Sequence, residues 1–124
     1  MTTIEILALT YLFVCLGVIG FQFALMAGAP WGQLTQGGQR SGPLPRSGRI
    51  AASASVFVLL GMAFSILSAA GFWPHWPSWT GWAALSVQTL STVLNWITRS
   101  AAERKLWAPI TTAMLCLAGT VVLA

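Results

Sequence analysis

Residues 4–26 read IEILALTYLFVCLGVIGFQFALM and contain a single charged side chain, Glu5. A helix rises 1.5 Å per residue, so a run of this length spans the roughly 30 Å hydrocarbon core of a bilayer. Backbone amides in hydrocarbon must be satisfied within their own segment, so the run is predicted to be helical. Three further apolar runs follow, at about 50–71, 79–97 and 106–122. We therefore expect an all-α protein, an integral membrane bundle of four transmembrane helices in one domain over residues 1–124.

The composition of the whole chain agrees with burial in lipid. Of its 124 residues, 56% are hydrophobic and 6% are charged, whereas a soluble domain usually carries about 25% charged residues. The net charge is +4, but the few cations flank apolar runs, so no nucleic-acid partner is expected. The expected partner is the lipid bilayer, with anionic headgroups near the cations.

The positions of the cations predict which way the helices lie. All six fall in two of the three gaps between the apolar runs, namely Arg40, Arg46 and Arg49 in the first and Arg99, Arg104 and Lys105 in the third. Segments rich in Lys and Arg stay in the cytoplasm. We therefore expect cytoplasmic loops at 27–49 and 98–105, an external loop at 72–78, and both termini outside. The expected location is the cell's inner membrane, crossed several times.

The middle gap is rich in tryptophan. Residues 72–82 read FWPHWPSWTGW, and tryptophan favours the headgroup region of a bilayer. The first interpretation is an outer aromatic belt with a stiff turn, and the alternative is an aromatic site for a lipid or a cation. His75 is the only histidine, and the two cysteines are far apart in the sequence. No metal and no cofactor are expected from so few ligands.

A glycine-rich stretch, GAPWGQLTQGG, follows the first apolar run at residues 28–38. Its glycines and proline stop a helix and permit positive φ angles. Two interpretations compete, a flexible linker and a structured loop that folds back against the bundle over a cavity. The stretch is not a phosphate-binding loop, because no Gly-Lys-Ser/Thr follows. Its candidate binding residues are Pro30, Trp31, Gly32, Gly37 and Gly38.

The third apolar run carries a polar seam. Gln88, Thr92 and Asn95 are spaced by four and three residues, so they share one helix face, which Arg99 extends. Polar groups in a bilayer need partners, so this face should point into the bundle or into an oligomer. The first interpretation is packing through interhelical hydrogen bonds, and the alternative is the lining of a pore or small cavity.

The stretch 95–109 holds the remaining candidate binding residues, Arg99, Glu103 and Arg104. Ser100 followed by Glu103 has the spacing of a capping box at a helix start. Glu103 is expected to pair with Arg99 or with a cation of the 27–49 loop. Such an exposed pair contributes about 0–1 kcal/mol, so its expected role is to shape the loop.

Two of these stretches resemble a signature of small bacterial four-helix membrane proteins that have no assigned activity. They are GAPWGQLTQGG at 28–38 and the pattern N-x-x-T-R-S-x-x-E-R-x-x-W-x-P at 95–109. The resemblance implies a bacterial inner-membrane protein and supplies no catalytic residues. Because both stretches are predicted on the cytoplasmic side, we expect them to lie against each other.

The expected function is association with itself or with a larger membrane partner, without enzymatic activity. Small residues that permit close helix contact recur at Gly61, Ser65 and Ala69, and again at Gly17 and Gly20. A cavity of about 300 Å³ or more is not expected in so small a bundle. The alternatives are an oligomeric channel or transporter lined by the polar seam and, with less support, a lipid-modifying enzyme.

Overall fold

The computed structural model describes residues 1–38 and 42–124. Its elements in these ranges are the helices α1 (Thr3–Met26), α2 (Arg46–Ala69), α3 (Ser78–Ile97) and α4 (Ala101–Leu123), with the short 3₁₀ turns η1 (Gly32–Leu34) and η2 (Gln36–Gly38). The prediction of an all-α fold with four long helices is therefore confirmed for the described residues.

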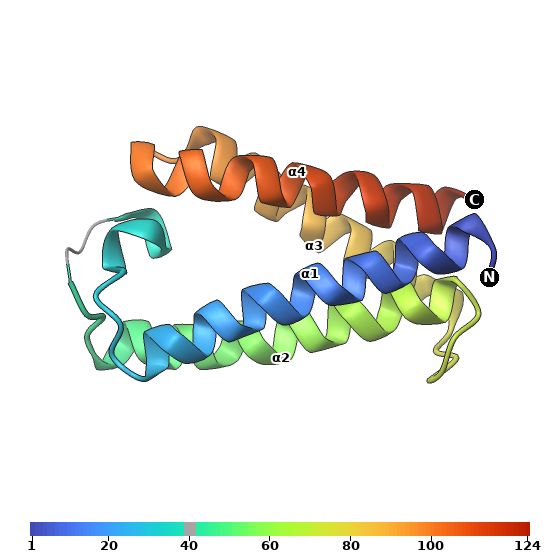
Figure 1. Ribbon diagram of the computed structural model, residues 1–124, viewed down its shortest axis with the longest axis horizontal. Coiled ribbons are helices and arrows are strands. Elements are labelled where there is room, and N and C mark those ends of the chain that lie inside the picture. Colours follow the sequence, from blue (N-terminus) through green and yellow to red (C-terminus); the bar gives the residue numbers. More distant parts are fainter. Residues whose placement is uncertain (39–41) are drawn as a thin grey trace.

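The helices form two antiparallel hairpins, α1 with α2 and α3 with α4 (Figure 1). Both termini and the α2–α3 connection lie at one end of the bundle, which we call the tryptophan end. The opposite end, which we call the loop end, holds η1, η2 and the α3–α4 connection. Figure 1 shows the hairpins diverging toward the loop end, where η1 and η2 lie between them.

The main hydrophobic core lies at the tryptophan end, where the hairpins meet. Its buried residues are Ala8, Tyr11, Cys15, Met62, Ala63, Ile66, Leu67, Ala84, Met114, Ala118 and Val121. Gly81 of α3 is buried here between α2 and α4, and an added Cβ would make ordinary contacts with Ala69 Cβ at 3.4 Å and Val122 Cγ2 at 3.5 Å. The small-residue stripe of α2 thus contacts α3 within the bundle at Ala69.

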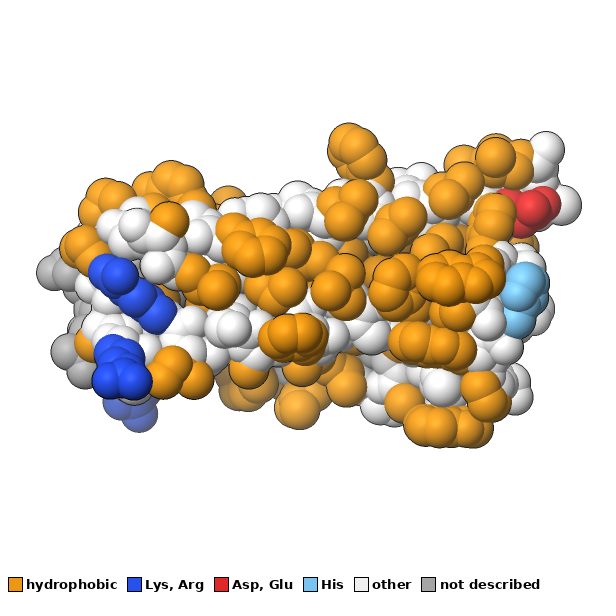
Figure 2. Space-filling model, turned by 90° about the horizontal axis from the view of Figure 1, so that it is seen from below, with side chains coloured by type: hydrophobic (Ala, Val, Ile, Leu, Met, Phe, Trp, Pro, Cys, Tyr) orange, Lys and Arg blue, Asp and Glu red, His pale blue; other side chains and the backbone are white. Residues whose placement is uncertain are grey.

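The outer surface of the bundle is apolar along most of its length. On the face shown in Figure 2, hydrophobic side chains cover the middle, while Lys and Arg gather at the loop end and the histidine lies at the other. Helices α1, α2 and α4 are long and apolar enough to cross a membrane, but α3 does not reach that threshold. Three such helices in a chain of this size indicate a membrane location.

The helices begin before the apolar runs that predicted them. Helix α2 begins at Arg46 rather than near residue 50, and α4 begins at Ala101 rather than near residue 106. Hydropathy marks the apolar span, whereas capping marks the helix end, and here Ser100 Oγ accepts the Glu103 N–H at 3.2 Å. The first and third connections therefore shrink from 27–49 and 98–105 to 27–45 and 98–100, while the second changes from 72–78 to 70–77 and is one residue longer.

Candidate functional site

The glycine-rich stretch is a folded loop, not an open linker. Trp31 stacks on the Phe21 ring of α1 with 5.5 Å between ring centroids, and Phe21 in turn meets the edge of Trp107 in α4 at 4.8 Å. Buried Gly32 donates its N–H to Gly42 O at 2.9 Å. Pro30 and Trp31 are exposed at the surface of this loop. The aromatic contacts thus join the loop to both hairpins.

Hydrogen bonds tie the same loop to the start of α4. The pairs are Gly37 N–H to Glu103 Oε2 at 2.8 Å, Ser100 Oγ–H to Gln33 O at 3.1 Å, and Trp107 Nε1–H to Leu34 O. Gly38 lies so close to α4 that an added Cβ would be 2.4 Å from Ser100 Cβ. The structure therefore brings together the two stretches that the sequence singled out.

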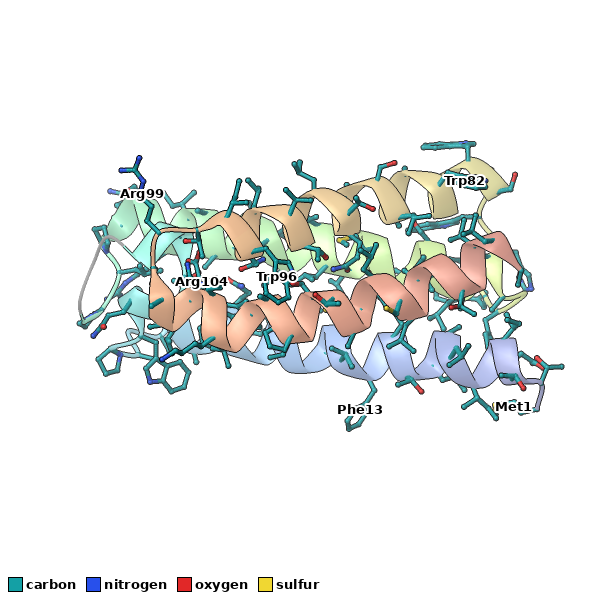
Figure 3. The ribbon with its side chains drawn as sticks, turned by 90° about the horizontal axis from the view of Figure 1, so that it is seen from above. Met1, Phe13, Trp82, Trp96, Arg99 and Arg104 are labelled. Atoms are coloured by element: carbon teal, nitrogen blue, oxygen red, sulfur yellow. The ribbon has the colours of Figure 1, made fainter. Side chains whose placement is uncertain are left out.

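Glu103 does not form the ion pair expected of it with Arg99. The Glu103 side chain is buried and accepts the backbone N–H of Gly37. Arg99 is exposed and points away from the bundle (Figure 3), while Arg104 donates to Thr98 O at 2.8 Å. Of the alternative partners, Arg49 donates to Leu44 O, Arg46 is exposed, and Arg40 lies outside the described residues. The Gly37 N–H gives the buried carboxylate a charge-assisted hydrogen bond. Unlike an arginine partner, it does not require a long side chain to lose conformational entropy.

The polar seam of α3 points into the bundle along most of its length. Gln88 Oε1 accepts the hydroxyl of fully buried Tyr11 at 2.8 Å, and Gln88 Nε2 donates to Thr111 O at 3.3 Å. Thr92 is also buried, and its hydroxyl proton is shared between Gln88 O of its own helix at 2.8 Å and Thr111 O of α4 at 3.1 Å. Asn95 is half-buried and bonds to Ser91 O of its own helix. The seam therefore joins α3 to α1 and α4, and exposed Arg99 is not part of this buried face.

A cavity of about 540 Å³ lies between the diverging hairpins, which is larger than the sequence suggested. The main core fills only the tryptophan end, and the aromatic contacts of the loop hold the hairpins apart at the other end. Its walls include residues from all four helices and from η2, among them Gln22, Met62, Gln88, Asn95, Trp107 and Glu103. The expectation of too little room is therefore wrong.

The cavity opens sideways between α2 and α3. Its lining residues on these two helices include Val58, Val87 and Leu94, which are 51%, 42% and 52% exposed. By contrast, the lining residues of α1 and α4 are half-buried or buried; Val18 of α1 and Met114 of α4 are examples. If the bundle sits in a bilayer, this opening faces hydrocarbon and not water.

The tryptophan-rich connection has a structural role in the described chain. Trp73 and Trp76 both meet the ring of Phe64 edge to face, at 5.9 and 5.8 Å, and Trp76 N–H donates to Ser68 Oγ at 3.0 Å. These contacts fix the turn onto α2. Trp73 remains 71% exposed, as an interfacial residue would be.

Sequence reasoning overlooked residues that the site depends on. Tyr11 was not paired with Gln88, although a buried tyrosine hydroxyl needs a partner. Trp107 and Gln36 also gave no separate signal, yet Gln36 Nε2 donates to Gly48 O at 2.8 Å and anchors η2 to α2. Among the described residues, no group of three or more His, Cys, Asp or Glu side chains is placed to hold a metal ion.

No family model, curated protein or solved structure matches this chain. The resemblance to small bacterial four-helix membrane proteins therefore stays a prediction.

Proposed function

We propose that the chain is a non-enzymatic binding protein of the bacterial inner membrane, which acts by associating with a partner inside the bilayer. The partner that the geometry supports best is a small amphiphile that enters from the lipid. One observation carries this proposal, namely the cavity of about 540 Å³ that opens between α2 and α3 beside exposed apolar side chains. Small-molecule sites usually have volumes of about 300–1,000 Å³.

Filling the cavity tests this function. We expect the double variant Ser55→Phe with Ser91→Phe to lower the affinity for tritiated dodecanol at least about tenfold, because both positions line the cavity and the added rings occupy its volume. Binding is measured in phosphatidylcholine nanodiscs, with empty nanodiscs subtracted. The matched control is Gly20→Leu, since an added Cβ at Gly20 meets nothing within 4 Å. Undiminished binding in the double variant, or none in the parent, would contradict the proposal.

The bundle is proposed to cross the membrane four times, with both termini outside and the loop end in the cytoplasm. Helix α3 has 20 residues, which corresponds to about 30 Å, and its polar residues Gln88 and Thr92 are buried away from lipid. Exposed Arg46, Arg99 and Lys105 lie at the loop end, as the positive-inside rule requires. There they would also meet anionic headgroups.

The orientation is tested by cysteine labelling in a background with Cys15→Ala and Cys116→Ala. We expect Gly42→Cys to react with a membrane-impermeant maleimide only after spheroplasts are permeabilised. Thr2→Cys should react in intact spheroplasts and serves as the positive control. Labelling of Gly42→Cys in intact spheroplasts is the result that would reverse the assigned orientation.

Self-association is the second candidate function. Gly17 and Gly20 lie on the exposed face of α1, and an added Cβ at either would meet nothing within 4 Å. Exposed glycines let a second helix approach closely. The control variant Gly20→Leu therefore has a second readout, because it should reduce the oligomer to a monomer in detergent. A parent that is already monomeric counts against this candidate.

The channel alternative retains less support. Its proposed lining, Gln88 and Thr92, bonds to α1 and α4 within one protomer. The main core also fills the bundle beyond the cavity at the tryptophan end. A cavity that ends at the core favours binding over passage.

A further inference from the structure

The cavity is polar at one end and apolar at the other. One face of α4 lines it with Glu103, Trp107, Thr111 and Met114, which span about 16 Å along the helix. Glu103 lies beside η2 at the loop end, and Met114 belongs to the main core. A ligand in this cavity is therefore oriented, with its polar head at the loop end and its apolar body toward the middle of the bundle.

The polar end carries negative charge. Glu103 is only 7% exposed, and no Lys or Arg is among the described residues that line the cavity. Three cations of the described loop end are directed elsewhere, since Arg104 bonds to Thr98 O, Arg49 bonds to Leu44 O, and Arg99 points outward (Figure 3). A buried carboxylate in a mostly apolar cavity favours a positively charged partner.

The side-chain amides of the cavity also favour a ligand head group that donates hydrogen bonds. Gln36, Gln88 and Asn95 each donate through the side-chain nitrogen to a backbone carbonyl oxygen, of Gly48, Thr111 and Ser91 respectively. Each of these nitrogens thus has an N–H bonded within the protein, and the Asn95 oxygen remains as an acceptor on the cavity wall. With the Glu103 carboxylate, the polar end presents acceptors, so it complements a head group that donates hydrogen bonds.

We propose that the ligand of this cavity is an amphiphile with a protonated amine head, which binds Glu103 while its apolar chain lies toward Met62 and Met114. The inference rests on the proposed function and names the ligand class for the same site. An alkyl amine resembles the lysine side chain, whose pKa is near 10.4, so it is charged at pH 7. It offers three N–H donors to the carboxylate and to the Asn95 oxygen. Charge-assisted bonds of this kind are about twice as strong as neutral ones.

The test compares three probes of equal chain length, dodecylamine, dodecanol and dodecanoate. Binding is measured in phosphatidylcholine nanodiscs and corrected for partition into empty nanodiscs. We expect the parent protein to bind the amine at least about tenfold more tightly than the alcohol and to bind dodecanoate weakest. We expect Glu103→Gln to abolish the preference for the amine, by lowering the amine affinity to that of dodecanol, while dodecanol still binds. Its amide oxygen still accepts the Gly37 N–H, so retained dodecanol binding shows that the cavity is intact.

The matched control is Glu5→Gln, because Glu5 is the other carboxylate of the chain and caps α1 at the tryptophan end. It should keep the full preference for the amine. Equal affinity for amine and alcohol, or a preference that survives Glu103→Gln, overturns the amine assignment while the binding function stands. Failure of all three probes to bind overturns both.

Discussion

Replacing Gly38 with alanine is expected to lower the free energy of unfolding by about 2–5 kcal/mol. Gly38 has φ +66°, and a left-handed backbone costs other residues roughly 1–2 kcal/mol. The new Cβ would also lie 2.4 Å from Ser100 Cβ and 2.9 Å from Gln33 O, so the backbone must move, at a further cost of about 1–3 kcal/mol. Ser100 caps α4, and its displacement weakens that helix start as well.

Gly42→Ala is the control for this prediction. Gly42 also has a positive φ, +84°, but an added Cβ there meets nothing within 4 Å. The control should therefore lose only the backbone contribution of about 1–2 kcal/mol. Both variants are compared by reversible unfolding in mixed micelles, and hydrogen exchange should rise at residues 32–38 in Gly38→Ala alone. Equal losses in the two variants would show that the contact between η2 and α4 contributes nothing.

Gln88→Leu is expected to be the second strongly destabilising change, by about 2–3 kcal/mol. The substitution removes the acceptor of Tyr11, whose hydroxyl is fully buried and bonds to Gln88 Oε1 at 2.8 Å. A buried donor left without a partner costs about 1–3 kcal/mol. The bond from Gln88 to Thr111 O is lost at the same time, so α3 is weakened against both α1 and α4.

A double-mutant cycle with Tyr11→Phe isolates the contact. The two losses should add to more than the loss of the double variant, by about 0.5–2 kcal/mol, because phenylalanine needs no acceptor. Thr89→Val is the control, since the exposed Thr89 hydroxyl bonds only to Leu85 O of its own helix, and it should change stability by less than about 0.5 kcal/mol. Strict additivity would mean that the Tyr11–Gln88 bond does not couple the helices.

The helices could be predicted from sequence because their signal is continuous along the chain. Apolar runs mark the middle of each helix, although polar residues interrupt the run of α3, and the helix ends depend on single caps. The capping-box spacing of Ser100 and Glu103 indicated where α4 starts, whereas hydropathy alone predicted a start near residue 106. Because α4 begins at Ala101, Pro109 lies inside the helix and not in its first turn, where a proline costs least.

The candidate site was predictable only in part, because its key contacts join distant residues. The sequence singled out Gly37 and Glu103, but their hydrogen bond spans 66 positions, and periodicity carries no information at that range. Charge pairing therefore suggested an arginine for Glu103. The cavity volume could not be predicted from the sequence for a different reason. It depends on how far the hairpins diverge, which the Phe21 and Trp107 contact helps to set.

The order of synthesis gives the hydrogen bond between Gly37 and Glu103 a further consequence. The glycine-rich loop leaves the ribosome well before its partners Ser100, Glu103 and Trp107. At about 5–20 residues per second, the 66 positions between Gly37 and Glu103 correspond to a delay of roughly 3–13 s. During that interval the first hairpin can insert and pair, and the loop can contact Phe21 and Gly48, but its contacts with α4 are still missing. The loop end of the cavity is therefore the last part of the molecule to take shape, and it does so only once α4 has been delivered to the membrane.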